Sequence, residues 1–393
     1  MNDSEVVERL AEIASNAGIH RISMLAWRDL DDPEAGGSEV HAARVAALWA
    51  RAGIDVTMRT SHAAGHPQVV WRHGYRVIRK AGRYLVFPRA VFSEIQRWHG
   101  DRDALVEIWN GMPWFSPLWC RGPRCVWLHH VHDSMWEMTL PPNWARVGRT
   151  LEFRVAPPVY RRTEIITLSE SSRDEIHAKL RIPLRRLHVV PVGIDPVYSR
   201  PPDDASGATR SPAPLVVAVG RLVPVKRFDV LVDALVAARD SVPDLQAVIA
   251  GEGYERESLD AQIAKAGAEH WITLAGRVSE SEKIALYRRA WVVASASAHE
   301  GWGMTLTEAA ACGTPAVATR IAGHEDAVAH GTSGLLADRD TDIAPALVAI
   351  LSDAGLRARL TSGALDHAAR FTWGATALGT LEVLATEARR RSR

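Results

Sequence analysis

Short apolar runs alternate with longer helix-like stretches along most of the chain. Residues 21–26 (RISMLA) form such a run, and a polar loop that contains glycine connects it to the helix-like stretch 40–49 (VHAARVAALW). This order then repeats, and continuous apolar runs of this length are typical of parallel strands buried on both faces. The other predicted strands in this half of the chain are 55–58, 104–108, 125–128 and 165–168. The pattern predicts an open α/β sheet.

A polar segment interrupts the pattern and divides the chain. Residues 199–214 (SRPPDDASGATRSPAP) are rich in Pro, Ser, Asp and Gly, so we predict an exposed connector. The strands predicted after it are 215–220, 246–251, 271–274, 291–294 and 315–318. We therefore expect two Rossmann-like doubly wound domains, residues 1–198 and 215–372, that face a central cleft. Such sheets bind ligands beyond the carboxyl ends of their strands, so the cleft is the expected site.

The length and composition agree with two soluble domains. A chain of 393 residues exceeds what one hydrophobic core usually organises. Its residues are 47% hydrophobic and 24% charged, as in ordinary globular proteins, and its formal net charge is +1. This balance argues against a dedicated nucleic-acid binder, so we expect a small-molecule partner and no nucleic acid.

The cysteines and the apolar runs indicate a cytoplasmic protein. Cys120, Cys125 and Cys312 are odd in number and lack paired metal-ligand spacing, so we expect reduced thiols, with neither zinc nor a disulfide. No apolar run is long enough to span a bilayer, and the N-terminus lacks the order of a signal peptide. The Arg-rich end, 389–393, leaves peripheral contact with the inner face of a membrane open, although such ends are more often solvated tails.

The stretch 299–315 (HEGWGMTLTEAAACGTP) is the most informative about chemistry. Glu300 and Glu308 are separated by seven residues, around a turn that contains glycine and the predicted start of a helix. The turn 301–305 would leave backbone N–H groups free at a helix N-terminus, which suits a diphosphate. Glu300 would then accept hydrogen bonds from sugar hydroxyls, and Glu308 would reach a ribose.

Two cations follow the first strand of the second series. Arg221 and Lys226 lie where a leaving diphosphate would need fixed positive charge as its bond to a sugar breaks. Arginine can bind two oxygens at once, whereas lysine supplies a point charge. The alternative is that both are surface residues after a strand.

The first domain offers a glycine loop and a histidine cluster. Gly36 and Gly37 follow the first strand, and they would let the backbone approach a phosphate or sugar closely. His129, His130 and His132 close the strand 125–128, where the sheet edge should open on the cleft. At least one of the three is expected to be a structural histidine.

These stretches together resemble the retaining glycosyltransferases of family 4 (glycosyl transferases group 1), whose hallmark is Glu, seven residues, Glu in an EGFG-like context. The resemblance covers most of residues 21–340 and includes 220–228 (GRLVPVKRF), 250–253 (AGEG) and 276–278 (GRV). It implies the GT-B fold and transfer of a hexose-type sugar from a nucleotide diphosphate-sugar to a hydroxyl acceptor. It also implies retention by front-face attack, with no metal and no other cofactor.

The resemblance also assigns residues. The donor-binding residues that it implies are Gly36, Gly37, Gly220, Arg221, Lys226, Gly251, Gly276, Arg277, Val278, Glu300, Gly301, Gly303, Met304, Thr305, Leu306 and Glu308. The catalytic residues are His130, Glu300, Arg221 and Lys226. Candidate acceptor-binding residues, chosen from the glycine loop, the tryptophan-rich segment and the histidine cluster, are Glu39, Trp109, Asn110, Trp114 and His132. The acceptor is left open between a glycan, a glycolipid and a small molecule.

Four details complete the expectations. Trp302 stands where the family usually has Phe, and Arg227 follows Lys226 where a glycine is common, which would alter the phosphate loop. From family habit, a last helix at about 373–390 should cross back onto the first domain. The acidic run 29–32 (DLDD) contains a DxD pattern but precedes the glycine loop, so we expect a solvated loop and not a metal site.

Two other functions fit parts of the pattern. A nucleotide-sugar epimerase of similar architecture would need no acceptor, but the context of Glu300 and Glu308 disfavours it. A nucleotide-sugar-binding protein without turnover would have little reason to keep Arg221, Lys226, Glu300 and the histidines together.

Overall fold

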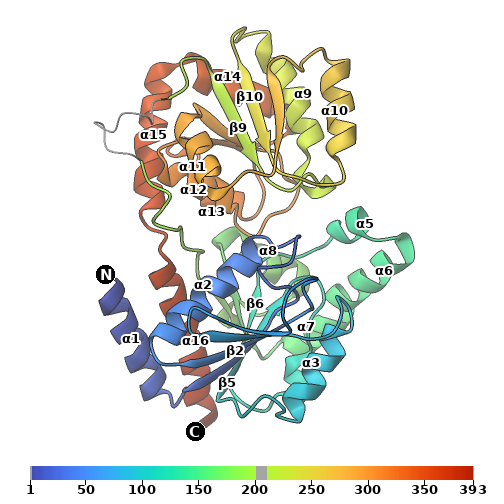
Figure 1. Ribbon diagram of the computed structural model, residues 1–393, viewed down its shortest axis with the longest axis vertical. Coiled ribbons are helices and arrows are strands. Elements are labelled where there is room, and N and C mark those ends of the chain that lie inside the picture. The colour runs from blue at the N-terminus through green and yellow to red at the C-terminus, as the bar shows by residue number, and fades with distance from the viewer. Residues whose placement is uncertain (1, 201–209, 393) are drawn as a thin grey trace. The chain divides into compact units, whose positions relative to one another are not determined.

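The computed structural model describes residues 2–200 and 210–392 and divides into two compact units. The first contains the residues up to Gly193 together with those from Thr372 onward, and the second runs from Ile194 to Phe371. Both units are α/β, as predicted. Figure 1 labels many of the elements of each unit.

The first unit is built on an eight-stranded sheet in the order β3-β4-β2-β1-β5-β6-β7-β8. Its strands are β1 (Arg21–Leu25), β2 (Asp55–Thr60), β3 (Val69–Arg72), β4 (Tyr75–Arg79), β5 (Ala104–Trp109), β6 (Arg124–Leu128), β7 (Glu164–Thr167) and β8 (Leu187–Val189). Neighbouring strands pair in parallel, except that β3 and β4 are antiparallel. The parallel core of this sheet places the ends of β1, β5 and β6 side by side.

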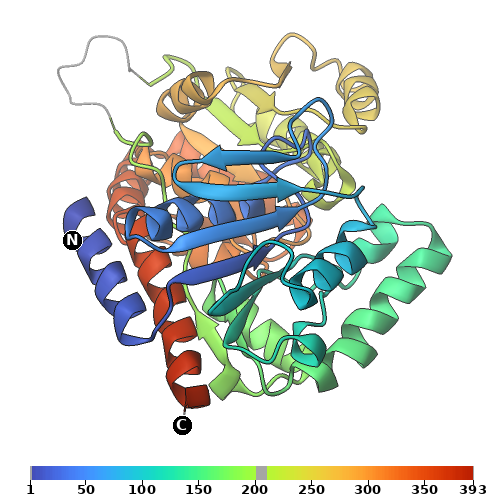
Figure 2. The ribbon, with the colours of Figure 1, turned by 60° about the horizontal axis from the view of Figure 1, so that its bottom comes forward.

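Helices cover both faces of this sheet. They are α1 (Asp3–Asn16), α2 (Gly37–Arg51), α3 (Val86–Ile95), α4 (Ser116–Trp119), α5 (Met135–Thr139), α6 (Pro142–Thr150), the π-helical turn η1 (Leu151–Val155), α7 (Ala156–Tyr160), α8 (Glu170–Leu180), the 3-10 turn η2 (Leu184–Arg186) and α16 (Trp373–Ser392). The last helix, α16, packs against α1, α2 and β6, and Figures 1 and 2 show it running beside α1. The end of the chain therefore completes the first unit.

The second unit is built on a six-stranded parallel sheet in the order β11-β10-β9-β12-β13-β14. Its strands are β9 (Leu215–Val219), β10 (Gln246–Ala250), β11 (Ile272–Gly276), β12 (Val292–Ser295), β13 (Ala316–Thr319) and β14 (Gly334–Ala337). Its helices are η3 (Pro224–Lys226), α9 (Phe228–Arg239), α10 (Arg256–Lys265), α11 (Glu280–Arg289), α12 (Met304–Ala311), α13 (His324–Ala327), η4 (Asp340–Asp342), α14 (Ile343–Ser352) and α15 (Ala354–Ala368).

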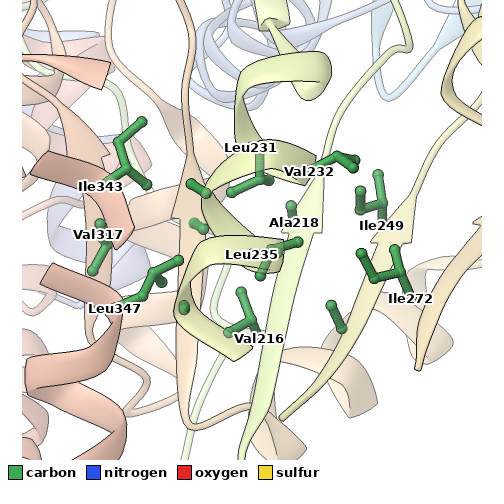
Figure 3. Packing of buried hydrophobic residues seen from close by; sticks show 14 of the residues in the cluster. Val216, Ala218, Leu231, Val232, Leu235, Ile249, Ile272, Val317, Ile343 and Leu347 are labelled. Carbon is green, nitrogen blue, oxygen red and sulfur yellow. The ribbon is translucent and has the colours of Figure 1, made fainter. Parts of the chain in front are cut away.

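A continuous apolar core stabilises the second sheet. Leu231 and Leu235 of α9 are buried with Val216 and Ala218 of β9, and Figure 3 shows them packed over that strand. Leu347 of α14 belongs to the same cluster. Burying a side chain of this size contributes roughly 1.5–3 kcal/mol, so this core holds the strand ends that carry the site.

The strands predicted from apolar runs are confirmed, whereas β3, β4, β8 and β14 were not predicted. β3 and β4 contain Arg72, Arg76 and Arg79 among their apolar residues, which hides the strand pattern. β8 (LHV) is only 3 residues long, and β14 (GLLA) begins with a glycine. Charged residues, a very short length or a glycine make the pattern of these strands weaker than the apolar runs of the predicted strands.

The boundary between the units lies earlier than expected. The predicted connector was 199–214, but the units divide after Gly193. Ile194 donates its N–H to the carbonyl oxygen of Phe371 at 3.1 Å, and the hydroxyl of Tyr198 bonds to Glu280. These contacts attach the segment before the connector to the second unit. Most of the connector, 201–209, lies outside the described residues.

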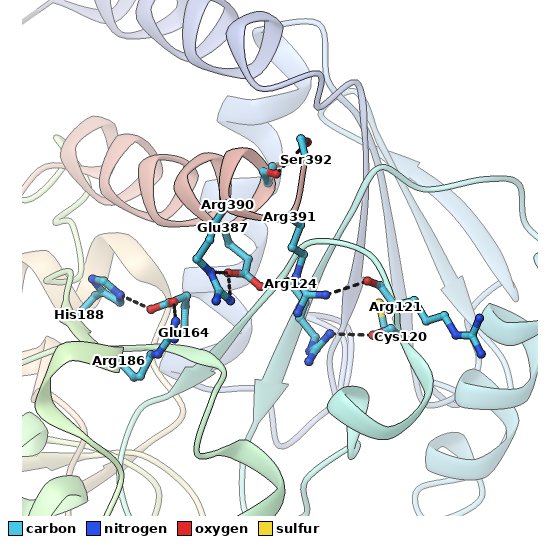
Figure 4. A network of polar contacts seen from close by, with 11 residues as sticks. Cys120, Arg121, Arg124, Glu164, Arg186, His188, Glu387, Arg390, Arg391 and Ser392 are labelled. Atoms are coloured by element: carbon cyan, nitrogen blue, oxygen red, sulfur yellow. Dashed lines mark hydrogen bonds and ion pairs between the residues drawn. The ribbon is translucent and has the colours of Figure 1, made fainter.

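The Arg-rich end is anchored and does not form a solvated tail over its described part. Glu387 is buried in α16 and accepts hydrogen bonds from Arg390, at 2.6 Å, and from Arg391. Arg391 also donates to the carbonyl oxygen of Arg121 at 2.8 Å, as Figure 4 shows. The predicted tail is therefore corrected to a fixed polar network on the first unit.

Candidate functional site

The predicted donor residues of the second unit gather at one edge of its sheet. β11, β10, β9 and β12 are successive neighbours and parallel, so their carboxyl ends lie together. Gly220 and Arg221 follow β9, Gly251 follows β10, and Glu300 lies in the loop after β12. Gly276 closes β11, with Arg277 and Val278 directly after it. The structure thus brings together residues that span about 80 positions of sequence, as ligand sites in such sheets require.

Glycine at position 251 is required by close backbone packing. Gly251 has φ of +149°, and a Cβ there would lie 1.8 Å from the carbonyl oxygen of Gly220. Leu222 also donates its N–H to the carbonyl oxygen of Glu252, in the loop after β10, at 2.9 Å. The two loops therefore form one rigid surface next to Arg221, whose side chain is exposed.

An ion pair links two of the predicted catalytic residues. Lys226, at the end of η3, forms an ion pair with Glu300 through its Nζ and the Oε1 atom of Glu300. Ser297 donates its hydroxyl to the same oxygen at 3.0 Å. Burial alone would raise the pKa of Glu300, but attraction to Lys226 and His324, with these hydrogen bonds, lowers it to about 2. Glu300 is therefore a carboxylate at any ordinary pH.

The glycine turn after Glu300 forms the N-terminus of α12. Gly303 has φ of +100° and precedes Met304, the first residue of the helix. The first N–H groups of a helix have no acceptor within it, so those of Met304 and Thr305 are available to an anion. Both residues are partly exposed, whereas Gly301, Gly303 and Leu306 are buried. Trp302 is buried too, edge-on against Phe371, so it fills a core position as Phe would.

Glu308 is held by α11. It is buried, and its Oε2 atom lies 3.1 Å from the hydroxyl of Tyr287 and 3.3 Å from Nζ of Lys283. Burial raises the pKa of Glu308, although Lys283 opposes this. To bind a ribose, the carboxylate of Glu308 would therefore exchange Tyr287 or Lys283 for a sugar hydroxyl.

Arg227 keeps the backbone shape that glycine would favour. Its φ is +51°, in the left-handed region, and it precedes α9 directly. Its guanidinium forms an ion pair with Asp340. The loop therefore keeps the geometry that a glycine would allow, and the left-handed conformation of Arg227 costs about 1 kcal/mol.

The sequence did not point to His324, which lies against the same glycine turn. It is fully buried at the start of α13, and its Nδ1 atom lies 2.9 Å from the carbonyl oxygen of Thr319. A Cβ at Gly303 would meet its ring at 3.0 Å. Burial lowers the pKa of His324, although Glu300 opposes this. The signal for His324 in the sequence was its position in 322–324 (AGH), a glycine turn that follows the predicted strand 315–318.

In the first unit, the glycine loop is held from within. Gly36 donates its N–H to Oε2 of Glu39 at 2.8 Å, and Oε1 of Glu39 lies 3.4 Å from Nε of Arg28. Both charged side chains are buried. Glu39 was a candidate acceptor contact; its carboxylate shapes the loop of Gly36 and Gly37, and the acceptor role stays a prediction.

We expected the acidic run before this loop to be solvated, but this prediction is wrong. Asp29 is buried and pairs with Nη1 of Arg72 at 2.7 Å and with Nε of Arg79 at 2.6 Å. Asp31 pairs with the same two arginines. Burial would raise the pKa of Asp29, but the two arginines lower it. The run is therefore an internal ion-pair network that anchors the loop.

The histidine cluster lies after β6, as predicted. The rings of His130 and His132 stack with centroids 4.8 Å apart, and both side chains are partly exposed. The backbone N–H of His132 donates to Oε1 of Glu152 at 2.7 Å. Glu152 is fully buried, and Trp136 donates to its other oxygen. Glu152 was not predicted, since a lone glutamate in a helix has no sequence signal.

Two of the candidate acceptor contacts are core residues. Trp109 and Trp114 are 1% and 2% exposed, and their indole nitrogens donate to the carbonyl oxygens of Gly111 and Ile108. Their burial favours a packing role, and the stacking role stays a prediction. Asn110 is partly exposed and lies 3.4 Å from Ser38 at the start of α2, which brings it beside the glycine loop.

His41 and His129 form a buried pair behind the exposed histidines. Nδ1 of His41 lies 3.2 Å from Nε2 of His129, and the ring of His41 stacks on Trp127 at 4.1 Å. Burial lowers the pKa of both histidines, and each is lowered further by a neighbouring histidine. The pKa of His129 falls to about 3. Both rings are therefore neutral in the folded protein.

Acid should destabilise the protein through this pair. Unfolding restores pKa values near 6.5, so the unfolded state binds more protons below that pH. As the pH is lowered below about 6.5, the free energy of unfolding should decrease by up to about 1.4 kcal/mol per pH unit for each histidine. Urea denaturation at several pH values measures the slope. His41→Phe should make it shallower and His20→Gln, at an exposed histidine, should not; equal slopes would contradict the assignment.

None of the helices that the structure describes has the length and apolar character needed to cross a bilayer.

Comparison with known proteins identifies the family. The model for Glycosyltransferase Family 4 matches residues 35–198, and that for Glycosyl transferases group 1 matches residues 199–367. A D-inositol 3-phosphate glycosyltransferase of Xylanimonas cellulosilytica is 28% identical, over 94% of this chain and 98% of that protein.

Solved structures share the fold. Sucrose-phosphate synthase from Thermosynechococcus elongatus superimposes with a TM-score of 0.77 at 20% identity, over 92% of this chain and 97% of that one. HepE from Anabaena, solved with UDP-glucose, gives a TM-score of 0.71 at 20% identity, over 92% and 98%. Because the two family models together match residues 35–367, the protein belongs to glycosyltransferase family 4, and it is a glycosyltransferase of the GT-B fold.

Proposed function

We propose that the protein transfers a hexose from a nucleotide diphosphate-sugar to a hydroxyl acceptor with retention of configuration and without a metal ion. The observation that carries this proposal is the edge formed by β11, β10, β9 and β12. There the Glu300–Lys226 pair, Arg221 and the N-terminus of α12 combine a carboxylate for sugar hydroxyls with cations and N–H donors for a diphosphate.

Each group has a role in the proposed reaction. Arg221 and Lys226 stabilise the negative charge that develops on the leaving diphosphate, and Glu300 orients the sugar through its hydroxyls. The acceptor hydroxyl attacks the face that the diphosphate leaves, and a phosphate oxygen takes its proton. His130, beside His132 after β6, contacts the sugar near its reacting carbon.

Lys226 changes partner when the donor binds in this scheme. In the free protein its charge compensates Glu300. A diphosphate is a stronger partner, and its arrival would release the carboxylate of Glu300 for the sugar hydroxyls. Because Ser297 still donates to Glu300, the carboxylate keeps its position during the exchange.

The relatives indicate where to begin with substrates. HepE was solved with UDP-glucose, which supports a UDP-sugar as the first donor to test. The relative from Xylanimonas cellulosilytica carries the name of an enzyme that acts on D-inositol 3-phosphate, which supports a phosphorylated polyol as the first acceptor. Glycans and lipid-linked sugars are the other acceptor classes.

The test is product analysis by NMR with a panel of nucleotide sugars and acceptors. We expect a glycoside whose anomeric configuration equals that of the donor, at a rate that EDTA leaves unchanged. Inversion of configuration would contradict the front-face mechanism, and activity that EDTA removes and Mn²⁺ restores would contradict metal independence. An altered donor sugar without an acceptor product would indicate an epimerase. Binding of the donor without turnover would indicate a nucleotide-sugar-binding protein.

A further inference from the structure

One helical segment of the first unit carries an apolar and basic surface that the proposed function does not use. The segment comprises α6, η1 and α7, residues 142–160, and Figures 1 and 2 show α6 projecting from the sheet of its unit. Its outward residues include Trp144, Val147 and Val155, which are 66%, 48% and 41% exposed. They follow the spacing of one face of a helix.

Arginines flank these apolar residues. Arg146, Arg154, Arg161 and Arg162 are exposed, and none forms an ion pair with a carboxylate within residues 2–200 and 210–392. Glu152 is the only acidic residue between positions 141 and 162, and it is fully buried. We call the exposed residues Trp144, Val147, Val155 and these four arginines the outer face.

The inner side of the segment already supplies its packing. Ala145, Gly148, Glu152 and Tyr160 are buried. A Cβ at Gly148 would lie 2.5 Å from the ring of Trp136, so the helix sits directly on that side chain. The outer face therefore contributes little to folding, and an exposed tryptophan in it calls for another explanation.

Charge decides which partner fits the outer face. A second copy of the chain would bring the same arginines together in a symmetric contact, which is unfavourable. A surface that is anionic and apolar just below its charges would pair with the arginines and take up the tryptophan ring. We propose that the outer face docks the protein on anionic lipid bilayers, with α6 lying along the surface.

This surface is separate from the Arg-rich end. Arg390 and Arg391 are engaged with Glu387, so they have partners within the protein. The inference also does not depend on the sugar-transfer chemistry, because none of the outer-face residues belongs to the proposed donor or acceptor site.

Vesicle co-sedimentation of the full chain tests the proposal. We expect binding to vesicles of phosphatidylglycerol and phosphatidylcholine, weaker binding at high salt, and little binding to phosphatidylcholine alone. Trp144→Ala and the double variant Arg154→Glu/Arg162→Glu should each lower the vesicle affinity by at least about tenfold. Because these side chains are exposed, thermal denaturation should stay within the range of ordinary surface substitutions.

Matched variants distinguish binding through this surface from non-specific binding through any exposed tryptophan or cation. Trp71 on the edge strand β3 is also 66% exposed, and Lys265 at the end of α10 is an exposed cation. Trp71→Ala and Lys265→Glu should leave vesicle binding unchanged. No binding to anionic vesicles, equal binding to neutral ones, or equal losses in the control variants would overturn the proposal, as would self-association abolished by Trp144→Ala.

Discussion

Glu300→Gln should lower turnover at least about a hundredfold, which is the scale of removing a preorganised electrostatic group. The amide can still bond to Ser297 and Lys226, so the position should remain folded. It loses the negative charge that balances Lys226 in the free protein and that would accept hydrogen bonds from the sugar. Steady-state kinetics with the identified donor measure the effect, which should appear in kcat more than in KM.

Lys226→Ala should have an effect of similar size, because it removes charge from the leaving diphosphate. Arg227→Gln is the matched control: it removes the neighbouring cation, whose guanidinium pairs with Asp340. We expect less than about a threefold change for it, as for a surface pair. Near-normal rates for Glu300→Gln or Lys226→Ala, or an equal loss for Arg227→Gln, would contradict the assignment.

Asp29→Asn should lower the free energy of unfolding by about 3–5 kcal/mol. Asp29 and Arg79 are both buried, and removal of the carboxylate charge leaves the guanidinium with only the partly exposed Asp31 to compensate it. Urea denaturation measures the loss. The variant should also weaken any ligand of the glycine loop, because the network holds the residues that precede Gly36.

Asp101→Asn makes the same chemical change in an exposed pair. Asp101 pairs with Arg97 at the surface, so its loss should cost under about 1 kcal/mol. Equal effects of the two variants would show that the buried network is not the anchor. Arg79→Met with Asp29→Asn should recover part of the stability, since the buried guanidinium is then removed together with its buried partner.

Much of the fold could be predicted because parallel strands are buried on both faces. Their continuous apolar runs mark β1, β5, β9 and β10 directly in the sequence. The donor edge could be predicted for a related reason: Gly220, Gly251 and Glu300 all follow such runs, and parallel strands end at the same edge. Only the family resemblance distinguished these residues from ordinary loop residues.

Pairing across long separations could not be predicted. Asp29 meets Arg72 and Arg79 only once β3 and β4 join the sheet, so the acidic run looked like a solvated loop. Trp109 and Trp114 looked available for stacking because apolar character does not distinguish a core from a site. His324 became visible only when the fold placed it beside Gly303.

The central claim is that the edge formed by β11, β10, β9 and β12 binds a nucleoside diphosphate. Isothermal titration calorimetry of the full chain with UDP, GDP, ADP and dTDP tests it directly. We predict selective binding of one nucleotide that Lys226→Ala weakens at least about tenfold and Arg227→Gln leaves unchanged. Absence of binding for every nucleotide, or binding that Lys226→Ala does not weaken, would contradict the account.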